Sequence, residues 1–189
     1  LFVTILNTLA PEFGYSPLKD SEVTTVRKTS LSRFLFQKLG FRFWKYKAFH
    51  RRGRALYREH LKTIEWFAGM PELYRKLQNN GHTVGVISTN STEAITELLA
   101  QQGLRAEFVV STSFFGKAKA ITQAIKEQGA DRAEAVYIGD ELRDIKACQK
   151  AKVDIIAVSW GLNAEETLKA TGVPVADSIA ELEHILLGK

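Results

Sequence analysis

The chain has 189 residues, of which 45% are hydrophobic and 25% are charged, and its net charge at pH 7 is +5. These values are typical of an ordinary globular protein with one sizeable core and room for a small added domain. No apolar run approaches the roughly 20 residues that a membrane-spanning helix needs, which excludes a membrane protein. A single cysteine, Cys148, excludes an internal disulfide framework, so we expect a protein of the reducing cytoplasm.

The positive charge belongs to one segment of the chain. Residues 11–65 carry 13 Lys or Arg against 5 Asp or Glu, a net charge of +8, so the other residues sum to −3. Such a segment can bind nucleic acid or an acidic partner, and a solvated helix face beside packed aromatic residues explains it equally well. The densest run of cations contains Arg42, Lys45, Lys47, Arg51, Arg52, Arg54 and Arg58.

The first third of the chain predicts one strand followed by helices. Residues 1–6 are apolar except for Thr4, which predicts a first buried strand. Proline and glycine in residues 11–17 indicate a connector. Apolar residues at helical spacing then predict one helix from about residue 20 to Gly40 and a second from about 44 to 64. We interpret these helices as an insertion.

The rest of the chain alternates between strands and helices. Four apolar, β-branched runs predict strands at 83–88, 107–110, 135–139 and 154–159, with helices of about ten residues between them. This order predicts an α/β fold, with a three-layer, Rossmann-like parallel sheet covered by helices on both faces. Ligands of such sheets bind where the carboxyl ends of the strands meet the amino ends of the helices.

Polar residues gather at those predicted strand ends. Thr89 and Asn90 follow one strand, Lys117 follows the next, with Lys119 as a second choice, and Asp140 and Asp144 follow a third. A hydroxyl, a cation and a pair of carboxylates at one edge of a sheet are typical of a site for phosphate and a metal ion. A plainer reading of Asp140 is that it caps the helix that follows it.

These motifs, in this order and at this spacing, resemble the haloacid dehalogenase-like hydrolase superfamily and its phosphoglycolate-phosphatase-like branch. Thr89-Asn90 is similar to the second motif of that family, Lys117 to the third and Gly139 to Asp144 to the fourth, and Ser159-Trp-Gly161 also fits. The resemblance implies a core of residues 1–10 and 66–189, with the first strand in its centre. It also implies a helical cap of residues 11–65.

The first motif departs from the family pattern, which is Asp-x-Asp-Gly-Thr-Leu. In register it matches residues 4–9, so Thr4 and Leu6 occupy the positions of the nucleophile and of the general acid and base. A Thr hydroxyl without a base is a poor nucleophile, and a Leu side chain transfers no proton. We therefore expect little or no phosphomonoester hydrolysis, although the family is a magnesium-dependent hydrolase.

The resemblance also implies which residues hold the ligand and the metal. Thr8, Thr89, Asn90 and Lys117 would bind phosphate, and Asp140 with Asp144 would hold magnesium, weakly because the Asp of the first motif is absent. Three functions stay open: an inactive relative that binds a small phosphorylated molecule or an inorganic anion, an active phosphatase with an unusual nucleophile, and a protein that binds nucleic acid or an acidic partner through the cap.

Overall fold

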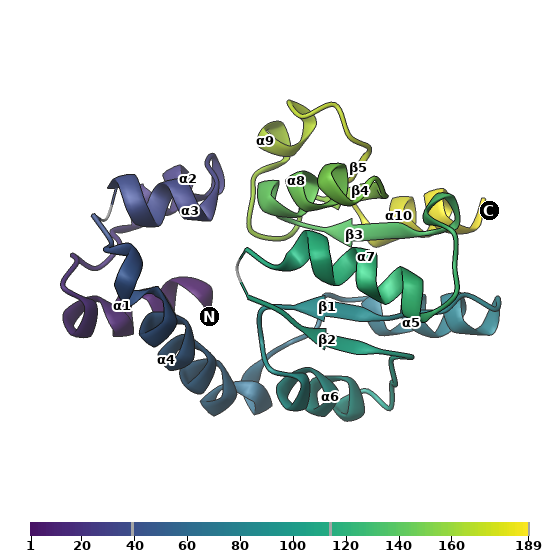
Figure 1. The fold of residues 1–189 in the computed structure, drawn as a ribbon, viewed down its shortest axis with the longest axis horizontal. Helices are drawn as coiled ribbons and strands as arrows, with labels where there is room; N and C mark the ends of the chain where they lie inside the picture. Colours follow the sequence, from purple (N-terminus) through teal and green to yellow (C-terminus); the bar gives the residue numbers. More distant parts are fainter. Residues whose placement is uncertain (39, 114, 189) are drawn as a thin grey trace. The chain divides into compact units, whose positions relative to one another are not determined.

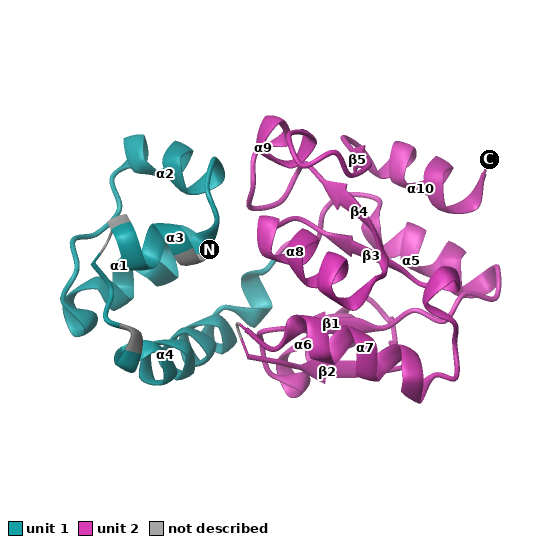
Figure 2. Cartoon of the chain, turned by 45° about the horizontal axis from the view of Figure 1, so that its top comes forward, with its two compact units in different colours: residues 1–64 teal, residues 65–189 magenta. Residues whose placement is uncertain are grey.

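The computed structural model describes residues 1–38, 40–113 and 115–188. The chain divides into two compact units, Leu1–Ile64 and Glu65–Lys189, which Figure 2 draws in teal and magenta. Among the residues described, none of the helices is both long and apolar enough to cross a membrane. The first unit is helical and consists of α1 (Phe2–Phe13), α2 (Asp20–Arg27), α3 (Leu31–Arg33), η1 (Phe34–Lys38), η2 (Phe43–Lys45), α4 (Tyr46–Glu59) and η3 (Leu61–Thr63).

The expected first strand is wrong, because residues 2–13 form helix α1. The buried side chains of this segment are Leu6, Leu9, Ala10 and Phe13, which recur every three or four residues and so line one face of a helix. A six-residue apolar run fits a strand and a buried helix equally well, and only the longer window reveals the helical period. Gly14 ends the helix at a φ of 76°, where its N–H donates to the carbonyl of Ala10.

The helices after α1 are shorter than the sequence predicts. The single helix expected up to Gly40 is broken into α2, α3 and η1, and the regular part of the next helix is α4. An aromatic cluster forms the core of this unit. The ring of Phe49 lies 5.2 Å from that of Phe13 and 4.8 Å from that of Phe41, measured between centroids. Such clusters bury large apolar areas, which explains why short helices suffice here.

The second unit confirms the predicted alternation of strands and helices (Figure 1). A short strand, β5, was not predicted, because two residues are too few to give a periodic signal. In chain order the elements are α5 (Met70–Asn79), β1 (Val86–Ser88), α6 (Thr92–Gln101), β2 (Val109–Ser111), α7 (Lys117–Glu127), η4 (Arg132–Glu134), β3 (Val136–Gly139), α8 (Leu142–Ala151), β4 (Asp154–Val158), α9 (Glu165–Lys169), β5 (Val175–Ala176) and α10 (Ile179–Leu187).

All strand pairs run parallel, which confirms the α/β class. The strands form two sheets, one of β1 and β2 and one in the order β3-β4-β5. The predicted central strand from residues 1–6 would have joined them, and the residues described supply no strand in its place. The core of the second unit therefore has two neighbouring sheets where one was expected.

Strand β4 shows how the helices cover both faces of the sheet. Its residues alternate: Ile155 and Ala157 pack into one apolar cluster with residues of α7, α8 and α9, and Ile156 and Val158 pack into another with residues of α5 and α10. A strand buried on both faces reads as a continuous apolar run, which is why this region was predictable. The strand ends are thereby fixed between two helical layers.

Cys148 of α8 is fully buried, and this predicts that its thiol is inert. Burial, with a smaller contribution from the nearby Asp144 carboxylate, raises the pKa of Cys148 to about 12. Since the thiolate is the nucleophile, the folded protein at pH 8 exposes none of it to reagents. We expect a disulfide reagent to label Cys148 only after denaturant is added. Rapid labelling of the folded chain would show that α8 opens readily.

Candidate functional site

Strand β3 and helix α8 carry the acidic part of the site. Asp140 follows the last residue of β3, and Asp144 lies in the first turn of α8. Lys117, the first residue of α7, forms a salt bridge with the carboxylate of Asp144. Both groups are buried, with exposed fractions of 8% for Lys117 and 2% for Asp144. Lys119 is exposed on the same helix, so the buried partner of the carboxylate is the first-choice lysine.

Lys117 has a second contact, with the ring of Tyr137 on β3. Its ammonium nitrogen lies 5.6 Å from the ring centroid, within the range of a cation–π contact. Burial, followed by the negative charge of Asp144, raises the pKa of Tyr137 well above its usual value. The tyrosine therefore stays neutral beside the salt bridge.

Asp140 is held by the loop that follows β4. The backbone N–H of Leu162 donates to Asp140 Oδ2 at 2.7 Å, and the N–H of Asn163 donates to the Asp140 carbonyl at 3.1 Å. The reading of Asp140 as a helix cap is wrong. The N–H of Leu142, at the start of α8, donates instead to Asn163 Oδ1 at 2.9 Å. A buried amide from a distant loop thus replaces the local cap.

A third carboxylate, Glu141, completes the cluster. Arg143 Nη2 donates to Glu141 Oε1 at 2.6 Å. Burial is the main cause that raises the pKa of Glu141, and repulsion by Asp144 and Asp140 adds to it. One oxygen from each of Asp140, Glu141 and Asp144 lies within 4.8 Å of the others. These hard oxygen donors fit the chemistry of magnesium, so the residues present suit the metal that the resemblance implies.

Sequence reasoning missed Glu141, Arg143 and Asn163. Glu141 and Arg143 stand between the two aspartates, so the sequence places them near the site. Nothing in the sequence indicates that they bond to each other. Asn163 follows Gly161 after a strand, which indicates only a turn. Its role depends on the approach of this turn to α8, and that approach belongs to the tertiary structure.

The predicted phosphate ligands of β1 lie at the carboxyl end of that strand. Thr89 and Asn90 follow Ser88, the last residue of β1. The N–H of Asn90 donates to Ser88 Oγ at 3.1 Å, and Ser111 Oγ, at the end of β2, donates to the Asn90 carbonyl at 2.8 Å. These bonds fix the turn at the edge of the sheet where Asp140 also follows its strand.

Thr4, Leu6 and Thr8 do not follow a strand. All three lie on α1 of the first unit, where Thr4 and Thr8 are exposed and Leu6 is 3% exposed. Thr8 Oγ1 donates to the Thr4 carbonyl at 2.9 Å, a bond that threonine often makes one turn back along a helix. The expectation that these residues end a central strand is therefore wrong, and so is its corollary that Thr4 and Leu6 stand there as substituted catalytic residues.

The cations of the first unit divide into two groups. Lys45 Nζ donates to the Phe13 carbonyl at 3.1 Å, and Arg52 pairs with Glu12 at 3.1 Å, so these two stabilise the helices. Arg42 lies over the ring of Trp44, a side chain that is 74% exposed. Binding of nucleic acid or an acidic partner stays a prediction for the exposed group, which includes Arg42, Lys47, Arg51 and Arg58.

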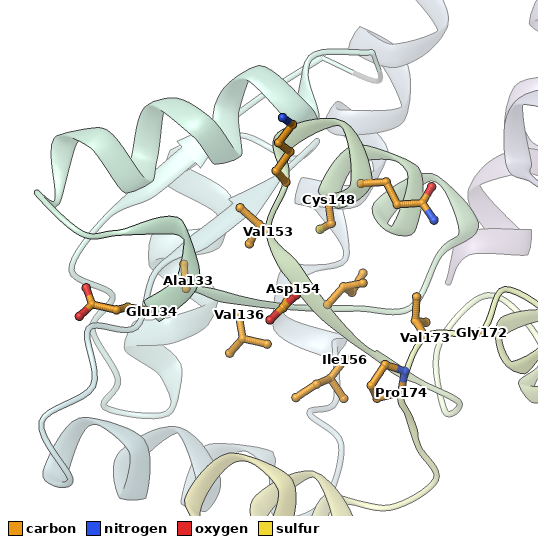
Figure 3. Close-up of a pocket in the computed structure, with 14 residues that line it drawn as sticks. Ala133, Glu134, Val136, Cys148, Val153, Asp154, Ile156, Gly172, Val173 and Pro174 are labelled. Carbon is orange, nitrogen blue, oxygen red and sulfur yellow. The ribbon is translucent and has the colours of Figure 1, made fainter.

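A shallow cavity of about 830 Å³ lies at the opposite end of the second sheet (Figure 3). Glu134 precedes β3, Asp154 begins β4 and Pro174 precedes β5, so the cavity opens at the amino ends of these strands. None of the predicted site residues lines it. Because ligands of parallel sheets bind at the carboxyl ends, we do not place the site there.

Gly161 allows the loop after β4 to approach Asp140. A Cβ atom at Gly161 would lie 2.2 Å from the Cβ and from Oδ2 of Asp140, which is too close for any rotamer to relieve. We expect Gly161→Ala to lower the free energy of unfolding of the second unit by about 1 to 3 kcal/mol, as overpacking does. The amide signal of Leu162 should also shift, since its bond to Asp140 is displaced.

The control for this variant is Gly53→Ala on α4. A Cβ there meets nothing closer than 3.8 Å, and alanine favours a helix more than glycine does. We expect an unchanged or raised stability, measured by urea unfolding. Equal effects of the two variants would contradict the close contact at Asp140.

The architecture and the sequence both match known proteins. The family model described as haloacid dehalogenase-like hydrolase matches residues 1–158. The chain belongs to this family. It is 31% identical to phosphoglycolate phosphatase from Synechococcus elongatus over 171 residues, which cover 89% of this chain and 80% of that protein. It is also 30% identical to pyrophosphatase PpaX from Listeria monocytogenes over 126 residues, which cover 61% of this chain and 58% of that protein.

Solved structures agree with the fold of this haloacid dehalogenase-like protein. One from Clostridium acetobutylicum, described as a predicted phosphatase, matches with a TM-score of 0.82 at 18% identity, over 99% of this chain and 90% of that chain. A haloacid dehalogenase-like family hydrolase from Streptococcus pneumoniae matches with a TM-score of 0.75 at 16% identity, over 98% and 89% of the two chains. At these identities the likeness supports the fold alone.

Proposed function

We propose that the second unit binds the phosphate group of a small phosphomonoester at the carboxyl ends of β1 and β3, and that residues 1–189 alone hydrolyse it poorly or not at all. The names of the relatives, a phosphoglycolate phosphatase and a pyrophosphatase, support phosphate esters and anhydrides as the substrate class. The Thr89 hydroxyl, the Asn90 amide and the cation of Lys117 have suitable chemistry for such an anion. The Thr8 hydroxyl donates to the Thr4 carbonyl within α1 of the first unit, so the proposal does not depend on it.

One observation carries the proposal of weak hydrolysis. Each carboxylate of the acidic cluster already has a partner: Lys117 for Asp144, Arg143 for Glu141 and the N–H of Leu162 for Asp140. A covalent mechanism needs an additional nucleophile that is aimed at the phosphorus atom. Thr4 lies on α1 of the first unit, and a threonine hydroxyl without a base to deprotonate it is a poor nucleophile. Binding without efficient turnover therefore fits these residues best.

Magnesium would be held by Asp140 and Asp144, with Glu141 near enough to contribute an oxygen. A bound magnesium ion offsets the negative charge of a phosphate beside these carboxylates. Lys117 neutralises Asp144 and thereby lowers the repulsion that an incoming anion meets. Asn163, Leu162 and Gly161 keep Asp140 in place, so they act as positioning residues.

Calorimetry with inorganic phosphate and phosphoglycolate, with and without magnesium, tests the binding. A phosphatase assay with 4-nitrophenyl phosphate tests the turnover. We expect measurable binding that Asp140→Asn weakens in the presence of magnesium, and turnover near the background rate. Asp154→Asn, at the opposite end of the sheet, is the matched control and should change neither.

Two outcomes would contradict the proposal. Substantial magnesium-dependent turnover that Asp140→Asn abolishes would favour the second function, an active phosphatase with an unusual nucleophile. Absence of phosphate binding under all conditions would leave the third function, in which the exposed cations of the first unit bind an acidic partner.

A further inference from the structure

Helix α4 carries a row of cations on one side. At 3.6 residues per turn, positions 47, 51, 54 and 58 fall within an arc of about 60° around the helix axis. Phe49 and Leu56, the buried residues of α4, lie on the opposite side of the axis. We call the four cations of this arc the basic stripe: Lys47, Arg51 and Arg58, which are exposed, and Arg54, which is half-buried.

The first unit has few acidic residues to balance these cations. Residues 1–64 carry 13 Lys or Arg and 4 Asp or Glu, a net charge of +9. Glu12 already pairs with Arg52, which lies outside the stripe, and Glu59 ends α4 about 100° away from Arg58 around the axis. Like charges three or four residues apart on a helix repel each other and destabilise it. A bound polyanion would relieve this repulsion.

An exposed tryptophan lies next to the start of the basic stripe. Trp44 belongs to η2, which directly precedes α4, and it is 74% exposed. The guanidinium carbon of Arg42 lies 5.5 Å from the centre of the Trp44 ring, which is a cation–π distance. An exposed indole costs free energy in water, and beside a cation it offers a flat surface on which a nucleic-acid base can stack.

We propose that the basic stripe and Trp44 form a binding surface for single-stranded nucleic acid, with phosphates along the stripe and a base stacked on the indole. Lys47 and Arg58 are about 16 Å apart along the helix axis, which is the length of about five stacked nucleotides. This surface belongs to the first unit, so the inference does not depend on the phosphate site of the second unit.

Two other polyanions fit this surface less well. An acidic peptide supplies negative charge, but it has no flat bases for the exposed indole. A membrane surface also attracts cations, but a helix that lies on it must insert its apolar face into the lipid. The apolar face of α4 is buried inside the first unit, where Phe49 packs against the rings of Phe13 and Phe41.

The salt dependence of binding tests the role of the basic stripe. Fluorescence anisotropy of a labelled oligothymidylate of about ten nucleotides, without magnesium, measures binding to the 189-residue chain. We expect the logarithm of the affinity to fall with the logarithm of the salt concentration with a slope of about −2 to −3.5. The double variant Lys47→Gln with Arg51→Gln should make this slope less steep by about 1.4, since each neutralised phosphate contributes about 0.7.

The matched control removes the same charge from the second unit. Lys126→Gln with Lys150→Gln changes two exposed lysines of α7 and α8, and it should leave the slope and the affinity unchanged. Equal effects of the two double variants would overturn the proposal, because binding would then follow the net charge alone.

Variants of the tryptophan test the stacking. We expect Trp44→Ala to weaken binding at least about fivefold, whereas Trp44→Phe, which keeps a flat ring, should stay within about threefold of the parent. Bound oligothymidylate should also quench the tryptophan fluorescence of the parent, and this quenching should disappear in Trp44→Phe, which retains Trp66 and Trp160. Phe67→Ala removes an exposed aromatic ring of the second unit and should leave the affinity unchanged.

Other probes and one variant of the second unit decide between classes of partner. At equal salt, we expect oligothymidylate to bind at least about tenfold more tightly than polyglutamate or vesicles that contain phosphatidylserine, and more tightly than a DNA hairpin. Asp140→Asn should leave this binding unchanged. The proposal is overturned if oligothymidylate does not bind, if any of the other three probes binds as tightly, or if Asp140→Asn abolishes the binding, which would assign it to the second unit.

Discussion

Lys117→Ala should lower the free energy of unfolding of the second unit by about 3 to 5 kcal/mol. The substitution leaves the Asp144 carboxylate buried without its cation, and an uncompensated buried charge is among the costliest defects in a protein. Urea unfolding, followed by circular dichroism, measures the change. Lys119→Ala is the control, since this exposed lysine of the same helix should cost less than about 0.5 kcal/mol.

A double-mutant cycle separates the loss of the pair from the burial of a lone charge. Asp144→Ala alone should be about as damaging as Lys117→Ala, because it strands the ammonium instead. The double variant Lys117→Met with Asp144→Leu removes both charges and should cost less than either single change. Additive effects of the two sites would contradict a direct salt bridge between them.

Leu6→Asp should unfold the first unit or lower its stability by more than about 4 kcal/mol. The change removes a buried leucine from the face of α1 that packs in the core, and it places a carboxylate there without a partner. The loss of helical circular dichroism and of the aromatic signals of Phe13 and Phe49 measures this unfolding. The variant also tests whether residues 2–13 form a helix, because a position at the end of a strand would accept an aspartate.

Thr4→Asp is the matched control for that prediction. Thr4 is exposed in the first turn of α1, where a negative charge interacts favourably with the helix dipole. We expect stability to stay equal or to rise by a few tenths of a kcal/mol. If the double variant Thr4→Asp with Leu6→Asp were as stable as the parent and gained magnesium-dependent phosphatase activity, the helical assignment of these residues would be wrong.

The two units differ in how well sequence patterns predict their helices and strands. Strand β4 and the turn from β3 into α8 were predictable, because Asp154-Ile-Ile-Ala-Val and Val136-Tyr-Ile-Gly are short apolar runs bounded by clear turn signals. The prediction of a strand at residues 1–6 is wrong because a short apolar run does not distinguish a strand from a helix. The first motif was aligned with the same segment, so the prediction that Thr4, Leu6 and Thr8 lie at a strand end is wrong as well.

The candidate site likewise contains residues that the sequence predicts and contacts that it does not predict. The pairing of Lys117 with Asp144 follows from a parallel sheet, which brings the ends of neighbouring strands to one edge, and both residues were named from sequence. Two other bonds depend on a loop that lies over 20 residues later in the chain and folds back. In this loop, Asn163 accepts a hydrogen bond from the start of α8, and Leu162 donates one to Asp140. No local pattern encodes such a contact, so the sequence did not predict that the N–H of Leu142 would donate to the Asn163 amide oxygen.

The chain passes from the first unit to the second only once, between Ile64 and Glu65. The motif reading expected two crossings, with the cap inserted into the core. Within residues 1–189, each unit is one uninterrupted stretch of polypeptide with its own apolar core. We therefore expect a protease that cleaves between residues 64 and 65 to leave each of these two stretches in one piece.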